Sequence, residues 1–423
     1  MEYLTNLKTN IMDKQLGHRE VSEGSTQPKP DPSGATMKAC VWDGPLNVKI
    51  AEVPKPTITH PKDVIVKTTA CTICSGSDSH IFSGEMPGIE KGAILGHESC
   101  GIVAEKGDEV NNLEIGDRVV IAFDLACGQC SFCKRHEYAA CDTTNDSKLM
   151  DVNYGSHHSA IFGYTKLLGD VPGCQAEYIR VPFAEINCCK LPDDIPDSEG
   201  LFMSDVLCTS LHACTLGEVK KGDTVAIWGM GPIGLYAGRW AQILGASKVI
   251  GIEVVPERIE LARQKFGFTV IDRNEVSDVP KKIMELVSNG VDCAIEASGF
   301  RFSTSILHKV ERAVGLETDS PDMITECLNA VRKYGHVSII ADYVGTSNQF
   351  PIGHVVMKHL TIRSGQCPCQ NYFGYVIDNI RSGKIDPRWM VTNKIKFDDL
   401  PDAYNKLFYK EDGYVKVYCD MTE

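Results

Sequence analysis

Four closely spaced cysteines are the clearest chemical feature of the 423-residue sequence. In the segment CGQCSFCKRHEYAAC they stand as C-x2-C-x2-C-x7-C, at Cys127, Cys130, Cys133 and Cys141. A loop of this length can fold four thiolates around one tetrahedral Zn²⁺ at about 2.3 Å each. Because the protein fills all four positions, such a site is structural and leaves no position for a substrate. Four unrelated thiols are the alternative, but close cysteine pairs in a reducing compartment more often bind metal.

A second set of metal-binding side chains is spread along the chain. Gly96-His97-Glu98 is a polar trio in the apolar segment GAILGHESCGIV, where an unpaired histidine and glutamate would be costly to bury. Taken alone, His97 is more often a hydrogen-bonded core histidine. Upstream, TICSGSDSH offers Cys74. A catalytic zinc takes three protein ligands and keeps one position open. The segment MSDVLCTSLHAC offers the third ligand, and spacing alone does not choose among Asp205, Cys208 and His212.

The glycine-rich segment WGMGPIG predicts a dinucleotide site. Gly229, Gly231 and Gly234 form G-x-G-x-x-G, with Pro232 and Ile233 between the last two glycines. This string alone is a weak signal because glycine-rich turns are common. Here it follows an apolar strand and begins a helix, so the turn can bring backbone amides against a pyrophosphate at the helix N-terminus.

The acidic end of the next expected strand favours NAD over NADP. Glu253 lies 19 residues after Gly234. A carboxylate there can accept hydrogen bonds from both ribose hydroxyls and would repel a 2′-phosphate. Arg258 lies five residues further on and could soften this preference, although a solvated helix charge is its more ordinary role.

Two patterns of secondary structure must position these residues. Short apolar strands separated by Gly, Pro and Asp turns are expected over 38–44, 64–70 and 118–123, which indicates a β-rich first domain. From about Asp223 the pattern becomes strand, helix, strand, as in a parallel sheet with crossover helices. That region combines strands over 224–228, 248–253, 291–298 and 336–343 with helices over 235–244 and 323–333.

We therefore expect two domains and a tail. Residues 1–36 end in the Pro/Ser/Gly run QPKPDPSG, which predicts a disordered N-terminal tail. A catalytic domain is expected over 37–206, with both zinc sites, and a coenzyme domain over 207–352. A return segment, 353–423, is expected to complete the catalytic domain.

Composition excludes some classes of function. The net charge of −13 and the lack of a Lys/Arg stripe argue against a nucleic-acid partner. No stretch approaches the roughly 18 apolar residues of a membrane span, and the N-terminus lacks the pattern of a secretion signal. The 18 cysteines of so long a chain indicate metal ligands and buried thiols rather than disulfides, so the expected location is the cytoplasm.

From Met37 onward the sequence resembles the zinc-dependent medium-chain alcohol dehydrogenases. The shared landmarks are Gly96-His97-Glu98, the cysteine loop, the glycine turn and Glu253, in the family's order. TIRSGQCPCQNYFGYV, together with Asp205, looks most like the branch containing glutathione-independent formaldehyde dehydrogenase and aldehyde dismutase. The resemblance implies an α/β fold, with a Rossmann-type doubly wound coenzyme domain and a GroES-like catalytic domain.

The resemblance also implies roles for individual residues. Cys74, His97 and Asp205 would bind the catalytic zinc, and Glu98 would be the neighbouring acid that can approach the metal. Asp78 would support the zinc-bound histidine. Ser77 and His80 match the hydroxyl and imidazole of the family's proton relay. The family usually has Cys-x-Ser-Asp, whereas Cys74 and Asp78 are separated here by one more residue, so either Ser75 or Ser77 could supply the hydroxyl.

The function implied is hydride transfer between an alcohol and NAD in an enzyme with two zinc ions per chain, one catalytic and one structural. A homo-oligomer, dimer or tetramer, is implied as well. One alternative is a formaldehyde dehydrogenase or aldehyde dismutase that holds its NAD tightly, in the branch where the coenzyme domain is lengthened, as it is here between Gly299 and Met323. A more remote alternative is a non-catalytic zinc-binding structural protein.

Overall fold

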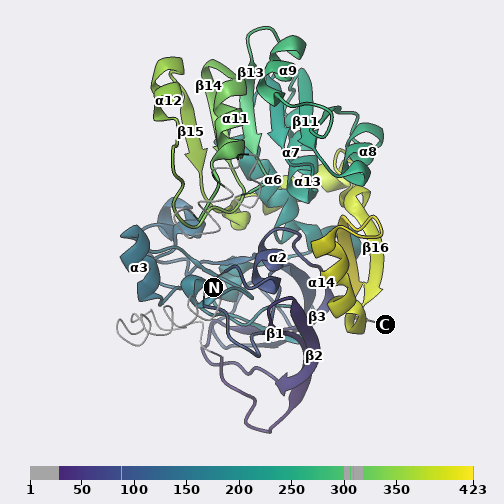
Figure 1. Ribbon diagram of the computed structural model, residues 1–423. Coiled ribbons are helices and arrows are strands. Elements are labelled where there is room, and N and C mark those ends of the chain that lie inside the picture. The colour runs from purple at the N-terminus through teal and green to yellow at the C-terminus, as the bar shows by residue number, and fades with distance from the viewer. Residues whose placement is uncertain (1–27, 87, 300–304, 306–307, 309–317, 423) are drawn as a thin grey trace. The chain divides into compact units, whose positions relative to one another are not determined.

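The structure, a computed structural model (Figure 1), describes residues 28–86, 88–299, 305, 308 and 318–422. The chain divides into two compact units. The first unit contains the described residues up to Cys208 and those from Cys367 onward, and the second unit contains the described residues of Thr209–Gln366. None of the helices described is long and apolar enough to cross a membrane.

The first unit is built on a mixed seven-stranded sheet. Its strand order is β16-β17-β3-β4-β5-β9, with β8 paired to β3. The same unit also contains two separate two-stranded sheets, β1-β2 and β6-β7. All pairings in these sheets are antiparallel except that of β16 with β17. The strands are β1 (Thr36–Gly44), β2 (Asn47–Pro54), β3 (Val64–Cys71), β4 (Ser99–Lys106), β5 (Arg118–Ile121), β6 (Asp124–Leu125), β7 (Ala160–Ile161), β8 (Tyr178–Val181), β9 (Cys188–Lys190), β16 (Val391–Lys396) and β17 (Lys416–Asp420).

Strand β3 is central to the first unit. It pairs with β4, β8 and β17, and all its residues except Lys67 are buried. Its buried residues include Thr68 and Thr69 as well as the apolar ones, so the strand is covered on both faces. Short helices connect the strands. They are α2 (Ser77–Phe82), α3 (Lys148–Tyr154), α4 (Ala184–Asn187), α5 (Asp197–Gly200), α13 (Phe373–Arg381) and α14 (Leu400–Tyr409), with 3-10 turns at Cys133–Arg135, Tyr138–Ala140, Lys166–Leu168, Leu201–Met203, Cys369–Asn371, Pro387–Met390 and Phe397–Asp399.

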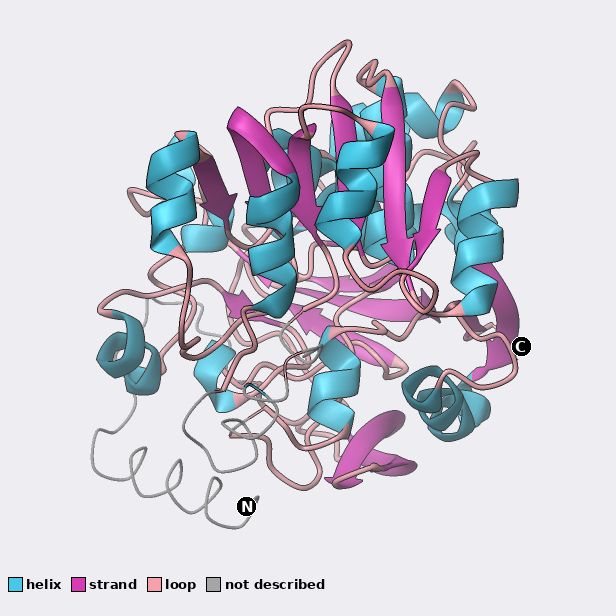
Figure 2. Cartoon of the chain, turned by 45° about the horizontal axis from the view of Figure 1, so that its top comes forward, coloured by secondary structure: helices cyan, strands magenta, loops and turns pink. Residues whose placement is uncertain are grey.

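The second unit is a parallel six-stranded sheet with the order β12-β11-β10-β13-β14-β15. The chain runs outward from β10 in one direction and then in the other, which makes the fold doubly wound. Figure 2 shows helices in front of and behind these strands. The strands are β10 (Thr224–Trp228), β11 (Lys248–Glu253), β12 (Thr269–Asp272), β13 (Val291–Glu296), β14 (Val331–Ile339) and β15 (Thr361–Ser364). The helices are α7 (Pro232–Ile243), α8 (Pro256–Gln264), α9 (Val279–Leu286), α11 (Asp322–Ala330) and α12 (Ile352–Lys358), while α6 (Val206–Leu216) begins in the first unit.

Two boundaries differ from those expected. The coenzyme unit ends at Gln366 and not at residue 352, because β15 hydrogen-bonds to β14 and so extends the parallel sheet. Its start lies at Thr209 rather than 207, inside α6. The helix expected to reach Lys333 ends at Ala330, since Val331 already pairs with Val291 as part of β14.

The predicted tail falls mostly outside the described residues, which begin at 28. Its last residues contact the segment that directly follows β2. Asp31 donates its backbone N–H to Lys55 O, Lys55 donates to Ala35 O, and Pro30 pairs with Pro56. Thr36 is already the first residue of β1. Most of the expected insertion between Gly299 and Met323 also lies outside the described residues.

Candidate metal centres and coenzyme site

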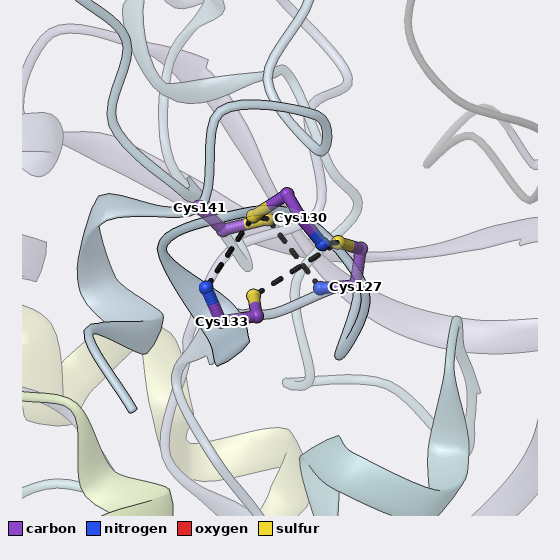
Figure 3. A group of neighbouring side chains, drawn as sticks. All are labelled: Cys127, Cys130, Cys133 and Cys141. Atoms are coloured by element: carbon purple, nitrogen blue, oxygen red, sulfur yellow. Dashed lines mark hydrogen bonds between the residues drawn. The ribbon is translucent and has the colours of Figure 1, made fainter. Parts of the chain in front are cut away.

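The four cysteines of the loop converge on one point, with their sulfurs facing inward (Figure 3). Their ligand atoms lie within 4.8 Å of one another. Cys127 Sγ is 3.9 Å from Cys133 Sγ, and Cys130 Sγ is 4.0 Å from Cys141 Sγ. Four sulfurs at 2.3 Å from a tetrahedral zinc lie about 3.8 Å apart, so the cluster fits that ion.

Backbone amides prepare the cluster to carry negative charge. Gln129 N and Cys130 N each donate to Cys127 Sγ at 3.3 Å, Cys133 N donates to Cys130 Sγ at 3.4 Å, and Cys127 N donates to Cys141 Sγ at 3.4 Å. Hydrogen bonds from Cys133 and the other thiols hold the pKa of Cys127 far below its ordinary value. Tyr138 and Phe183 pack around the sulfurs. This buried, amide-lined shell is typical of a structural zinc site.

A second group of donors lies in the same unit. It consists of Cys74, His97, Glu98 and Asp205, whose ligand atoms also lie within 4.8 Å of one another. Cys74 follows β3, His97 and Glu98 immediately precede β4, and Asp205 immediately precedes α6. Strands β3 and β4 are antiparallel neighbours in which Cys71 pairs with Ser99, so Cys74 and His97 are brought together by sheet register. Four buried or half-buried donors in one place fit a divalent cation.

Gly96 allows the chain to turn into this site. Its φ is +89°, a left-handed value that favours glycine, and a Cβ would lie 2.5 Å from the side chain of Gln175. Gln175 itself is fully buried. It donates to Thr72 O at 3.1 Å and to Asp78 Oδ2 at 3.4 Å, and accepts from Tyr404 Oη at 2.9 Å. A buried amide therefore ties Asp78, in the first turn of α2, to Tyr404 of α14.

His97 lies between two carboxylates. Its Nδ1 is 3.2 Å from Asp78 Oδ1, and its Nε2 is 3.6 Å from Asp205 Oδ2. Burial by itself lowers the pKa of His97, but Asp78 and Asp205 outweigh burial and hold the pKa well above its ordinary value. Asp78 also accepts the backbone N–H of Cys74 at 2.9 Å, so one carboxylate supports two of the candidate ligands.

The structure separates the three candidates for the third ligand. Among the described residues, the donor group includes Asp205 and neither Cys208 nor His212. The Cys208 thiol instead donates to Met203 O at 3.1 Å. His212 is further along α6 and belongs to the second unit. The geometry therefore favours Asp205.

The proposed relay residues lie on and just before α2. Ser75 and Ser77 are half-buried and flank Gly76, whose Cβ would lie 3.9 Å from Cys74 Sγ. His80 is buried, and its Nδ1 is 3.0 Å from Glu85 Oε2, a side chain that is 40% exposed. The choice between the two serines stays open.

One residue that the sequence reading missed is Lys416, the first residue of β17. Its ammonium lies 2.5 Å from Glu98 Oε1, with both side chains buried, and it donates to Ile73 O at 3.1 Å. Burial lowers the pKa of Lys416, but Glu98 and Cys74 outweigh burial and raise it. A lysine more than three hundred residues away in sequence gave no local signal that could have revealed it.

The glycine turn has the shape that a pyrophosphate site needs. Gly229 has φ of +89°, and Gly231 is extended at the N-cap of α7, which begins at Pro232 and contains Ile233. At Gly234 a Cβ would lie 1.8 Å from Gly229 O, so only glycine allows the helix to start so close to the strand. The turn therefore keeps its backbone accessible at a helix N-terminus, as a dinucleotide requires.

Glu253, at the end of β11, faces this turn. It accepts the backbone N–H of Met230 at 2.9 Å, of Val254 at 2.7 Å and of Val255 at 3.1 Å. Arg258 Nη1 is 3.8 Å from Glu253 Oε2, so the arginine is turned towards the acid and is mostly buried rather than fully solvated. A carboxylate has about four acceptor positions, which leaves capacity for a ribose hydroxyl.

Comparison with known proteins agrees with both units. Residues 60–193 match the family described as "Alcohol dehydrogenase GroES-like domain", and residues 232–316 match "Zinc-binding dehydrogenase". A zinc-type alcohol dehydrogenase-like protein of Bacillus subtilis (strain 168), itself described as uncharacterized, is 34% identical over 383 residues, covering 90% of this chain and 99% of the relative. A formaldehyde dismutase of Pseudomonas putida is 31% identical over 397 residues, covering 88% and 95%.

The solved structure of alcohol dehydrogenase TADH from Thermus sp. ATN1 is also similar. It shares 30% identity and a TM-score of 0.78, and the match covers 91% of this chain and 99% of that one. The first family match spans Cys74, His97, Glu98 and the cysteine loop, and the second begins within the glycine turn, at Pro232. The chain therefore belongs to the zinc-dependent medium-chain alcohol dehydrogenases, with a GroES-like unit and a Rossmann-type unit.

Proposed function

We propose that the protein transfers hydride between an alcohol and NAD, with one catalytic and one structural zinc ion per chain. The observation that carries the proposal is the buried group of Cys74, His97 and Asp205 with Glu98, separate from the four-cysteine loop. Cys74, His97 and Asp205 would fill three positions of a tetrahedral zinc and leave the fourth for a substrate oxygen, whereas the cysteine loop fills all four.

When bound, zinc and NAD supply a Lewis acid for the alcohol oxygen and an acceptor for hydride. The residues of the chain prepare the site for both. Cys74 and Asp205 together carry two negative charges, which match a divalent cation. Asp78, which contacts Nδ1 of His97, leaves Nε2 for the metal.

The alcohol proton must reach solvent for hydride transfer to proceed. Ser77 or Ser75 would pass it to His80, whose contact with the partly exposed Glu85 continues the path outward. Hydroxyl and imidazole groups suit this task because both can donate and accept a hydrogen bond.

NAD is the proposed coenzyme. Gly229, Gly231 and Gly234 would hold the pyrophosphate, with Pro232 and Ile233 at the start of α7. The support for NAD over NADP is the Glu253 carboxylate at the end of β11, because a 2′-phosphate would meet its negative charge. The neighbouring Arg258 reduces this repulsion without removing it.

A homo-oligomer is proposed as the working state. Support comes from the edge of the six-stranded sheet, where β15 has a neighbour on one side only among the described strands. The adjacent helix α12 has no buried residue, and it exposes Ile352 by 62%, Val356 by 57% and Met357 by 74%. Apolar side chains next to an open strand edge are a surface that a second copy can cover.

A reducing location, the cytoplasm, is proposed for the same chain. All 18 cysteines lie among the described residues and all are free thiols there. Five of these cysteines are expected to bind zinc, and thirteen further free thiols are typical of a reducing compartment.

The function is tested by incubating zinc-loaded protein with NAD and a panel of primary and secondary alcohols, and with NADH and aldehydes or ketones. We expect alcohol-dependent NADH formation, measured by absorbance, and faster turnover with NAD than with NADP. A protein that carries zinc at both centres and turns over no member of the panel would contradict the proposal and would support the non-catalytic alternative.

The second candidate, an aldehyde dismutase or formaldehyde dehydrogenase with tightly held NAD, is favoured by the formaldehyde dismutase relative. The protein is purified without added coenzyme and denatured, and released NAD is measured. About one NAD per chain, with aldehyde consumed while NADH does not accumulate, would replace the first candidate by the dismutase. Protein that releases no NAD and depends on added coenzyme would exclude the dismutase.

A further inference from the structure

A buried lysine and glutamate stand at the edge of the proposed catalytic zinc centre. The Lys416 side chain is 1% exposed and Glu98 is fully buried, and their charged atoms are 2.5 Å apart. Two charges removed from water need good geometry and further hydrogen bonds to be tolerated. Among the described residues, Lys416 donates one such bond, to the backbone O of Ile73, just before Cys74. A buried ion pair that serves only stability can often be replaced by apolar side chains. The position of Lys416 and Glu98 beside the metal ligands therefore indicates a further role for the pair.

The charges of the centre give that reason. A divalent cation is balanced by the Cys74 thiolate and the Asp205 carboxylate. Glu98 adds a third negative charge within the same group of ligand atoms. The ammonium of Lys416, 2.5 Å from Glu98 Oε1, is the positive charge that balances it.

The two oxygens of Glu98 are in different situations. Oε1 accepts from Lys416, whereas Oε2 is buried without a hydrogen-bond partner among the described residues. A buried carboxylate oxygen next to three metal ligands can gain a partner by binding the metal. That movement would fill the position that a substrate oxygen needs.

We propose that Lys416 is a positioning residue that holds Glu98 by Oε1 and keeps it from closing the fourth position of the catalytic metal. This inference rests on the zinc centre of the proposed function. Without the lysine, Glu98 is an uncompensated anion in the interior, and the nearest positive charge is the metal itself.

The test uses full-length protein with Co²⁺ in the catalytic centre. Its visible absorption spectrum is recorded, and the rate at which a chelator removes the metal is measured, alongside turnover. The variants are Lys416→Met, Lys416→Arg and the double variant Glu98→Gln/Lys416→Met. Lys394→Met is the matched control, because Lys394 forms a 2.9 Å ion pair with Asp420 on the neighbouring strand but is 54% exposed.

We expect Lys416→Met to change the cobalt spectrum, to slow removal of the metal by about tenfold and to lower turnover by about 10- to 100-fold. Lys416→Arg and the double variant should restore wild-type metal removal, since the first keeps the charge and the second removes the anion. Lys394→Met should change none of these values.

If Lys416 only stabilises the fold, the rate of metal removal should change in the opposite direction. Lys416→Met would then loosen the centre and release the metal faster, or leave spectrum and release unchanged, and either result would overturn the inference. If Lys416→Met does not fold, Lys416→Gln keeps a hydrogen-bond donor without the charge and is expected to slow release in the same way. Failure of the proposed function is seen separately, as a wild-type protein that binds no metal at Cys74, His97 and Asp205.

Discussion

At the scale of single residues, the main question is which side chains complete the proposed catalytic metal site. Cys74 and His97 could be paired on sequence grounds, but three candidates remained for their partner. The structure places Asp205 Oδ2 3.6 Å from His97 Nε2, while the Cys208 thiol is engaged by Met203 O. An aspartate binds zinc through oxygen and contributes the second negative charge of the site.

Asp205→Ala should therefore remove one of two zinc ions. The expected result is a loss of about one zinc equivalent per chain together with activity, because two remaining ligands hold zinc weakly. Metal content is measured on purified protein, and circular dichroism checks the fold. Cys208→Ser is the control and should keep both ions. An Asp205→Ala variant that retains both zinc ions would show that the third ligand lies elsewhere.

Glu253 is the residue on which coenzyme choice depends. Glu253→Gln should weaken NAD binding more than NADP binding, so that the preference ratio of kcat/KM falls by about tenfold, since repulsion of the 2′-phosphate is lost. Both coenzymes should also bind less tightly, because the amide presents one acceptor oxygen where the carboxylate presents two to the N–H groups of the turn. Steady-state kinetics with both coenzymes give the ratio.

The control for this change is Glu257→Gln, an exposed acid in the first turn of α8. It removes the same charge a few residues away and should leave the ratio within about twofold, because exposed charges are screened. An unchanged ratio in Glu253→Gln would mean that another group selects the coenzyme.

At the scale of elements, Asp292 joins three strands of the coenzyme sheet. Its carboxylate accepts from Thr224 N at 2.8 Å and Thr224 Oγ1 at 2.9 Å on β10, and from Arg332 Nε at 2.6 Å on β14. Burial tends to raise the pKa of Asp292, but these partners outweigh burial and lower it. Thr224 is the first residue of β10, the strand that leads into the glycine turn. The Asp292 carboxylate therefore fixes the start of that strand.

Asp292→Asn should lower the free energy of unfolding by about 1–3 kcal/mol at neutral pH. The folded carboxylate has the lower pKa, so its stabilisation is present above the unfolded pKa of about 3.9 and is lost as pH falls through the folded value. Urea unfolding at pH 7 and near pH 3 measures this difference. The difference in the free energy of unfolding between wild type and Asp292→Asn should be smaller at the lower pH.

Asp194→Asn provides the comparison for Asp292. Asp194 pairs with Arg381 in the first unit with 58% of its side chain exposed, and the change should cost less than Asp292→Asn because exposed ion pairs contribute little to stability. Equal effects of the two substitutions would show that Asp292 has no special role in the sheet.

At the scale of the whole molecule, the open edge of the parallel sheet bears on assembly. The charged substitution Val356→Glu with Met357→Glu should shift the proposed oligomer towards monomer, because it places negative charges on the apolar face of α12. Light scattering after size exclusion gives the mass. Val152→Glu, an equally exposed apolar residue on α3, should leave the mass unchanged. A wild-type protein that is already monomeric would contradict the proposed homo-oligomer.

Local sequence patterns predicted the bounds of some strands correctly and the ends of other elements wrongly. The strands expected over 224–228 and 248–253 have the bounds of β10 and β11, because buried parallel strands are apolar runs closed by turns. The end of the helix near Lys333 and the boundary near residue 352 were wrong, since pairing of β14 and β15 with the sheet outweighed local preference. Such pairing is a long-range contact that no local window contains.

The sequence by itself determined what is encoded by close spacing. The cysteine loop lies within fifteen residues, and the glycine turn with Glu253 lies within one strand-helix-strand unit, so chain connectivity alone brings their atoms together. Tertiary structure decided the rest of the candidate site. It set Asp205 against His97 from a different part of the chain, and it brought Lys416 to Glu98 through the order β17-β3-β4. These contacts depend on which strands become neighbours, a choice made by burial of the whole sheet and not by residues near either partner.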